Sequence, residues 1–260
     1  MNEELKIIKE QEVEEGRYVY CVVYSNKPVN LGNIGIENNE VYTIPFGEIC
    51  AVVHKCPAKP YKSDNEEEVK EWVKTHQNVI DKAYKELGIV IPFGFDVIIK
   101  GTNDKVLDWL KAESEILKEK IEKIKGKQEF GVQIFWDKKF IAKNVAETNE
   151  EIKKLKTEIE ELSKGMVYFH KQKIENILKK EMEKKADFYF KIFYNDIKEH
   201  VEDVKVEKIK EQDMLINLSC LVLKDKVKEL GAELDKINKL KEFSVRFTGP
   251  WPPYSFVSPG

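Results

Sequence analysis

The feature that most constrains this sequence is an apolar stripe of helical period between residues 152 and 197. Its members fall in two runs: Ile152, Leu155, Ile159, Leu162, Met166 and Phe169, then Ile174, Leu178, Met182, Ala186, Tyr189, Phe193 and Ile197. Steps of three and four residues form the heptad seam of helices that bury one face against a partner. The seam slips near His170 and contains Gly165, where we expect a kink or short break. The second half of the chain is therefore predicted to contain long coiled-coil helices.

The first half of the chain follows a different period. Residues 17–24 form a continuous β-branched and aromatic run, which is typical of a buried strand. Further strand-like segments are 41–46, 49–54, 89–91, 97–99 and 130–136. Apolar residues recur at helical spacing between Asp64 and Gly88 and again over 103–125. For the first of these helices, Asp64 or Ser63 is the expected N-cap and Gly88 the expected end. This mixture predicts an α+β sandwich of ferredoxin-like type.

The domain boundary is expected near residues 138–147, where a polar run precedes the long helices. The prediction is then an N-terminal arm of residues 1–16, an N-terminal α+β (ferredoxin-like) domain of 17–140 and a C-terminal α+β domain of 141–260. The second domain is completed by strands at 201–209 and 215–222, a helix over 227–237 and a last strand at 244–247. The length of the whole chain, 260 residues, also suits one or two domains.

Charge limits the partners that such a chain can have. It carries 44 basic and 47 acidic side chains, a net charge of −3, so no cationic field attracts a polyanion. Arg17 and Arg246 are its only arginines, and arginine is the usual reader of phosphate groups. We therefore expect no nucleic-acid partner. An acidic N-terminus and the lack of an apolar run near 18 residues predict no signal peptide, no membrane association and a cytoplasmic location with reduced cysteines.

No pattern of catalytic or metal-binding residues is recognisable. His76 lies on an apolar helical stripe with no second histidine or acid at i+3 or i+4. We expect it to be a buried, hydrogen-bonded structural residue rather than a metal ligand. Cys50 and Cys56 alone do not make a zinc site, and neither a nucleophile elbow nor a phosphate-binding glycine loop occurs. The sequence predicts no enzyme, no cofactor and no metal.

One strand is loosely similar to an RNA-recognition motif. Residues 130–134 read Phe-Gly-Val-Gln-Ile and follow Lys125-Gly-Lys127. Val132 and Ile134 stand where base-stacking rings are needed, so a core strand is favoured. An RNA-binding module on a ferredoxin-like sheet stays open as a weaker alternative.

The C-terminal segment Gly249–Val257 combines aromatic residues with three prolines, which restrict the backbone and remove donors. A free tail would leave Trp251, Tyr254 and Phe256 in water. We favour a tail that packs back over its own domain. In the alternative, the tail offers these three residues to a partner, and they are our candidate partner-binding residues.

Four stretches of the sequence carry a family resemblance. They are Tyr18–Val23, Glu48–Val53, Trp72–Ile80 followed by Val90–Gly94, and Phe130–Asp137 together with Thr248–Val257. They span nearly the whole chain and resemble the gas vesicle protein F/L family, the GvpF/GvpL proteins. Where that family often has Leu-Arg-Phe-Gly, this chain has Ile91-Pro92-Phe93-Gly94, so an arginine common there is absent. The resemblance does not separate F from L.

The resemblance implies a non-enzymatic accessory protein of gas vesicle formation, located at the gas vesicle or in the cytoplasm. Such proteins bind the small hydrophobic shell protein and other accessory proteins during nucleation and assembly. The family also has a modified ferredoxin-like N-terminal domain and a C-terminal α+β domain with coiled-coil helices. A minor structural role in the vesicle itself is the alternative, because an F-type member is placed on the gas-facing side. The oligomeric state is not indicated.

A physical mechanism follows from that implied partner. A short and very apolar shell chain aggregates unless its surface is shielded before assembly. A highly charged protein can shield it through an exposed strand edge or a groove, by β-augmentation or helix-in-groove docking. We expect the N-terminal domain to make this contact and the coiled-coil region to recruit other accessory proteins.

Overall fold

A computed structural model of the chain describes residues 14–160 and 164–257. Its contacts form two compact units. Unit 1 combines the chain up to Lys125 with the segment that begins at Pro252, and unit 2 is Gly126–Trp251. Each unit is a mixture of helices with an antiparallel sheet, which confirms the α+β class.

The sheet of unit 1 is built around its first strand. Its strands are β1 (Glu15–Tyr24), β2 (Asn30–Gly32), β3 (Val41–Phe46), β4 (Ile49–Pro57), β5 (Val90–Pro92) and β6 (Ile98–Lys100). The order is β2-β3-β4-β1-β5, and β6 also pairs with β1, next to β5 along the same edge. β1 is central because its β-branched and aromatic residues bury both faces of the strand.

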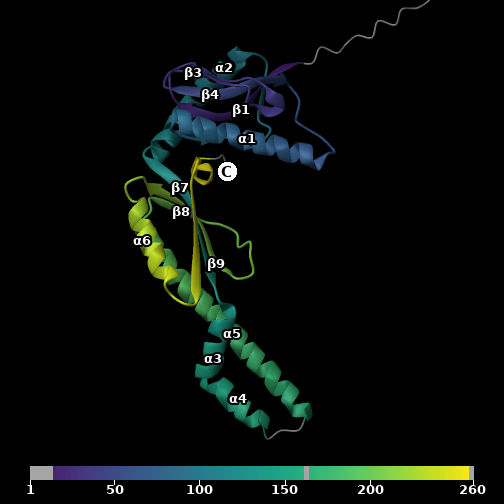
Figure 1. The fold of residues 1–260 in the computed structure, drawn as a ribbon, viewed down its shortest axis with the longest axis vertical. Helices are drawn as coiled ribbons and strands as arrows, with labels where there is room; N and C mark the ends of the chain where they lie inside the picture. The colour runs from purple at the N-terminus through teal and green to yellow at the C-terminus, as the bar shows by residue number, and fades with distance from the viewer. Residues whose placement is uncertain (1–13, 161–163, 258–260) are drawn as a thin grey trace, which may run out of the picture. The chain divides into compact units, whose positions relative to one another are not determined.

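Two long helices cover opposite faces of this sheet, α1 (Glu66–Leu87) and α2 (Asn103–Ile124) (Figure 1). Tyr18 and Tyr20 of β1 pack with Trp72 and Ile80 of α1. The side chain of Val19 points to the other face, and α2 contacts β1, β3 and β4. The element order departs from the ferredoxin-like β-α-β-β-α-β, because β2, β3, the short 3-10 helix η1 (Ile36–Asn38) and β4 come before the first long helix.

The N-cap of α1 differs from the prediction by one residue. Asn65 is the cap, and its side-chain oxygen accepts a hydrogen bond from the backbone N–H of Glu67 at 3.0 Å. Ser63 supports the cap by accepting from the N–H of Asn65 at 3.1 Å. Gly88 ends the helix with a φ of 88°, as predicted.

Unit 2 has a four-stranded sheet with helices on one face. The strands are β7 (Lys127–Trp136), β8 (Asp203–Val206), β9 (Met214–Leu223) and β10 (Phe243–Trp251), in the order β10-β7-β9-β8. Alternate residues of β7, including Phe130, Val132 and Ile134, pack with α3 (Lys138–Thr148), α5 (Lys164–Lys198) and α6 (Val227–Asn238). The RNA-motif-like strand is therefore a core strand, as predicted.

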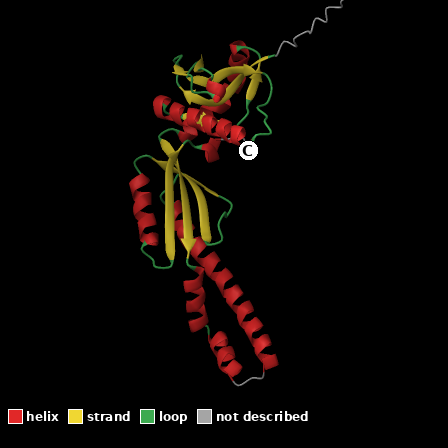
Figure 2. Ribbon diagram, turned by 45° about the vertical axis from the view of Figure 1, so that its right-hand side comes forward, coloured by secondary structure: helices red, strands yellow, loops and turns green. Residues whose placement is uncertain are grey.

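The predicted seam is divided between α4 (Glu150–Glu160) and α5, which lie side by side (Figures 1 and 2). A hydrogen bond joins His170 to Glu158 at 3.2 Å, and an ion pair joins Lys173 to Glu151 at 3.1 Å. α4 ends at Glu160 and α5 begins at Lys164, and Leu162 of the seam lies outside the described residues. Seam residues nearest the sheet are buried, whereas Met166 and Phe169 are exposed.

The predicted domain limits differ from the two units. A boundary at 140/141 assigns β7 to the N-terminal domain, but β7 is an inner strand of unit 2, between β9 and β10. The last described helix, α7 (Tyr254–Val257), belongs to unit 1 instead of the C-terminal domain. The predicted arm of 1–16 falls mostly outside the described residues, and its last two residues begin β1.

Candidate functional site

Two tyrosine–histidine pairs lie buried between β1 and α1 in unit 1. The Tyr18 hydroxyl is 2.8 Å from Nδ1 of His76, and the Tyr20 hydroxyl is 2.7 Å from Nδ1 of His54. All four side chains are at most 4% exposed. The rings of Tyr18 and His54 stack at a centroid distance of 5.0 Å, so the two pairs form one network.

The hydrogen bonds of this network fix the tautomer of His76 and are consistent with the same tautomer for His54. Nε2 of His76 is 3.2 Å from the Phe93 carbonyl, which only accepts, so Nε2 carries the proton and Nδ1 accepts from the Tyr18 hydroxyl. Tyr18 in turn accepts from the N–H of Asp96 at 3.0 Å. The second pair is arranged alike: the Tyr20 hydroxyl accepts from the N–H of Ile36 at 3.0 Å and donates to His54.

Burial keeps every group of the network neutral. It lowers the pKa of His54 to about 4 and also lowers the pKa of His76, because desolvation penalises the imidazolium. It raises the pKa of Tyr18 and of Tyr20 for the same reason. Glycine at position 35 lets the backbone of the 35–36 segment lie close to the Tyr20 hydroxyl, since a Cβ on residue 35 would be 2.9 Å from that oxygen. His76 is buried and hydrogen-bonded, as the sequence predicts.

The network also positions one wall of a surface hollow. Nε2–H of His54 donates to the Tyr61 hydroxyl at 3.0 Å, and the Tyr61 ring meets Trp72 edge-on at 5.2 Å. Both rings line a hollow of about 510 Å³ together with Glu37, Pro57, Lys59, Pro60 and Lys62. Rigid aromatic walls with a charged rim suit an apolar segment of a partner, so this hollow is our candidate docking site.

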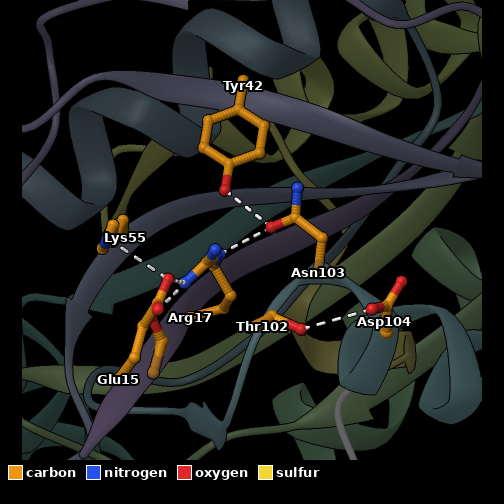
Figure 3. Close-up of polar contacts among 8 residues, drawn as sticks. Glu15, Arg17, Tyr42, Lys55, Thr102, Asn103 and Asp104 are labelled. Atoms are coloured by element: carbon orange, nitrogen blue, oxygen red, sulfur yellow. Dashed lines mark hydrogen bonds and ion pairs between the residues drawn. The ribbon is translucent and has the colours of Figure 1, made fainter.

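A second polar cluster anchors the opposite helix (Figure 3). Arg17, which is 6% exposed, donates from Nε to Oδ1 of Asn103 at 2.6 Å and from Nη1 to Glu15 at 2.6 Å. The Tyr42 hydroxyl donates to the same Asn103 oxygen at 2.8 Å. Asn103 is the first residue of α2, so this oxygen ties the helix to β1 and β3. The role of Arg17 in this cluster is structural.

Exposed apolar side chains gather on α5. Those at least 38% exposed are Met166, Tyr168, Phe169, Phe188 and Ile192. They form two groups, one in the first turns of α5 and one in its second half. This α5 surface is the second candidate site of the molecule.

The three predicted tail residues have different environments. Phe256 is 6% exposed, and its ring lies 5.8 Å from the Lys123 ammonium. The Tyr254 hydroxyl donates to Gln77 of α1 at 2.8 Å. Trp251 is 48% exposed at the end of β10, in unit 2. The end of the tail is packed, as we favoured, but on a different domain from the one expected: α7 belongs to unit 1 and contacts β5.

All four cysteines are free and buried. Burial raises the pKa of every thiol, to about 11 for Cys56 and about 12 for Cys220. Within residues 14–160 and 164–257, no group of three or more histidine, cysteine and acidic side chains is placed to hold a metal ion. No helix in that part of the chain is long and apolar enough to cross a membrane.

Sequence patterns did not reveal that each of the two histidines pairs with a tyrosine of β1. His54 lies on a strand and His76 on a helix, and their tyrosine partners are on β1, so the network joins residues far apart in the sequence. One signal was present: alternating Tyr18 and Tyr20 place two hydroxyls on the same face of a buried strand, where each requires a hydrogen-bond partner.

Comparisons with known proteins place this fold and these motifs in a family. A sequence model described as "Gas vesicle synthesis protein GvpL/GvpF" matches residues 16–258. The chain is 27% identical to gas vesicle protein L1 of Halobacterium salinarum, over 96% of this chain and 92% of that protein. It is 20% identical to gas vesicle protein F of Dolichospermum flosaquae, over 92% and 96% of the two chains.

A solved structure shares the fold. The crystal structure of the gas vesicle protein GvpF from Anabaena has a TM-score of 0.77 at 18% identity, and the match covers 95% of this chain and 99% of that one. The chain therefore belongs to the GvpL/GvpF family of gas vesicle synthesis proteins, and this membership implies a role in gas vesicle formation.

Proposed function

We propose that the chain is a non-enzymatic accessory protein of gas vesicle formation, one that binds the hydrophobic shell protein and other accessory proteins during nucleation and assembly. The observation that carries this proposal is the family match across residues 16–258. The charged surface supports it, because 35% charged residues keep a complex with an apolar partner in solution.

In this proposal the hollow of unit 1 receives an apolar segment of the shell protein. Tyr61 and Trp72 supply aromatic contact area, and the buried histidine network holds Tyr61 in place without a loss of side-chain entropy on binding. The exposed rim carries Lys59, Lys62 and Glu37, which stay in water around the bound segment. The mode is helix-in-groove docking.

The α5 surface is assigned to the other accessory proteins. Met166 and Phe169 are spaced by three residues, and Phe188 and Ile192 by four, so each pair presents apolar side chains on one side of the helix to a partner. Trp251 adds a further exposed ring at the end of β10. Among the three candidate tail residues, Trp251 has the accessible ring that such binding requires.

A blocking experiment tests the hollow. The native thiols are buried with raised pKa values, so a cysteine introduced as Lys59→Cys at the rim is the one expected to react with a maleimide. A bulky maleimide on that residue is expected to abolish suppression of shell-protein aggregation, measured by light scattering after dilution from denaturant. The matched control carries the same group on Lys111→Cys, an exposed position of α2.

Two outcomes contradict this assignment. If the blocked rim leaves suppression intact, the hollow is not the docking site. If neither the labelled nor the unlabelled protein suppresses aggregation, the chain does not shield the shell protein.

A second candidate is a minor structural component of the vesicle. It is favoured by the same exposed rings of α5, which suit a permanent seat on an apolar wall as well as a transient partner. Intact vesicles washed at high salt distinguish the two: a structural component stays with the vesicles, and an assembly factor is recovered in the wash.

A further inference from the structure

The outer edge of the unit 2 sheet carries a groove that no packing within the unit explains. The groove is about 380 Å³ and lies between α6 and the side chains of β10, the yellow-green helix and yellow strand of Figure 1. Gly231, Ala232, Val245 and Phe247 supply its apolar lining, and Lys228 and Asp235 its charges. Phe247 is 37% exposed there.

The main chain of β10 is open along only part of this edge, because the N–H of Phe243 donates to the Leu240 carbonyl at 3.1 Å. β10 pairs with β7 on one side and is the last strand of the sheet order. The N–H of Val245 points away from β7, because it donates to Oδ1 of Asn238 on α6 at 3.0 Å. Strand alternation gives Phe247 the same orientation, so its N–H and C=O face outwards. This is the geometry that accepts a further strand.

Gly231 is costly for the helix that contains it. It lies in the interior of α6, where glycine destabilises a helix relative to alanine. A Cβ on Gly231 would meet no atom within 4 Å, so packing inside the unit does not require the glycine. A glycine with open space around it on a helix face is suited to the close approach of another backbone.

The charges on this face are arranged symmetrically about its small residues. Lys228 is three residues before Gly231, and Asp235 is three residues after Ala232. All four lie on one face of α6, since they are spaced by three, four and seven residues. If a second α6 lies antiparallel across this face, each Lys228 meets an Asp235 and the small residues meet at the centre.

The centre of that pattern lies level with Phe247, where the edge of β10 stays open. Asn238 marks where α6 lies beside Val245. From Asn238 to the midpoint of Gly231 and Ala232 the helix rises ~10 Å, which corresponds to about three residues of strand and reaches Thr248. A single two-fold axis near Phe247 and Thr248 can therefore relate both α6 and β10 to their copies.

We propose that this face, the α6–β10 face, is an interface with a second copy of the chain about a two-fold axis. The two β10 strands meet antiparallel, and Phe247 and its copy exchange both backbone hydrogen bonds, while the N–H of Val245 keeps its bond to Asn238. The two α6 helices cross at their small residues, and Lys228 pairs with Asp235 of the other copy at both ends. Arg246 does not oppose its copy, because it points to the other face of the sheet and pairs with Glu211 at 3.0 Å.

Sedimentation velocity on the full chain over a range of concentrations tests the interface. The wild type is expected to dimerise, and Asp235→Lys to raise the dimer dissociation constant at least about tenfold, because each dimer then holds two like-charge contacts. The exchange Lys228→Asp with Asp235→Lys restores both pairs and is expected to restore dimerisation. Glu229→Lys makes the same change of charge on α6 away from this face and is expected to have little effect.

A second variant separates the interface from folding. Gly231→Leu improves helix propensity and enters open space, so the melting temperature is expected to stay or rise while the dimer is lost. A wild type that is monomeric at every concentration overturns the proposal. A dimer that tolerates both Asp235→Lys and Gly231→Leu also overturns it, because it then forms through another surface.

Discussion

At the scale of the residue, the buried histidines make the stability of unit 1 depend on pH. The pKa of His54 is about 4 in the folded chain and near 6.5 when unfolded, and that of His76 is also lowered. Between these values the unfolded chain binds more protons than the folded one, so stability rises with pH. The stabilisation is fully present above pH 6.5 and is lost as the pH falls towards 4.

The expected loss for His54 is roughly 3 kcal/mol between pH 7 and pH 4. Urea unfolding at a series of pH values measures the loss, and NMR of the imidazole rings identifies the residues that titrate. An unfolding free energy that does not change between pH 6.5 and 4.5, or a His54 ring that titrates near 6.5, contradicts the neutral buried network.

The hydroxyl of Tyr20 stabilises unit 1 through two buried hydrogen bonds. Tyr20→Phe removes the donor to His54 and the acceptor for the N–H of Ile36, and both partners stay buried. We expect a destabilisation of about 1–3 kcal/mol in urea unfolding. Tyr24→Phe is the control, because its hydroxyl bonds Glu48 at an exposed site, and it is expected to cost less than about 0.5 kcal/mol. Equal effects of the two changes contradict the account.

At the scale of the element, the amide of Asn103 fixes α2 to the sheet. Asn103→Ala leaves the buried Arg17 guanidinium and the Tyr42 hydroxyl without the oxygen that both donate to. The expected cost is about 2–3 kcal/mol, with faster hydrogen exchange in the first turns of α2. Asn144→Ala, at an exposed position of α3, is the matched control and is expected to be close to neutral. Unchanged exchange in α2 contradicts this anchoring role.

Local patterns were sufficient to predict most of the elements. α1 was expected from its stripe and from Gly88, and β1 from its run of apolar residues. α3 was not expected, because its apolar positions are few and residues 138–147 look like a polar linker. α7 was also missed, since two prolines precede it and it has only four residues. Its packing on unit 1 stabilises it more than its own propensity does.

At the scale of the whole molecule, unit 1 depends on the far end of the sequence. The chain leaves unit 1 after Lys125 and returns at Pro252. Phe256 and Val257 are buried in unit 1 by this return. Strand pairing decided where the units divide, and pairing between distant segments is not visible in a local window, so the predicted boundary at 140/141 differed from the structure.

A chain that ends at Trp251 tests this arrangement. It loses the burial of Phe256 and Val257, which contributes about 1.5–3 kcal/mol for each side chain. Hydrogen exchange is expected to accelerate in β5 and α1, which contact α7 or its side chains, and to stay slow in β9. Exchange that is unchanged in β5, or that accelerates in the sheet of unit 2 alone, contradicts the placement of α7.

The proposed binding of the gas vesicle shell protein is tested most directly by co-expression of this chain with that protein. The soluble fraction is separated by size-exclusion chromatography and both proteins are followed. We expect a soluble shell protein that co-elutes with this chain. If the shell protein stays wholly insoluble, or elutes apart from this chain, direct capture is contradicted, and the chain then acts on other accessory proteins.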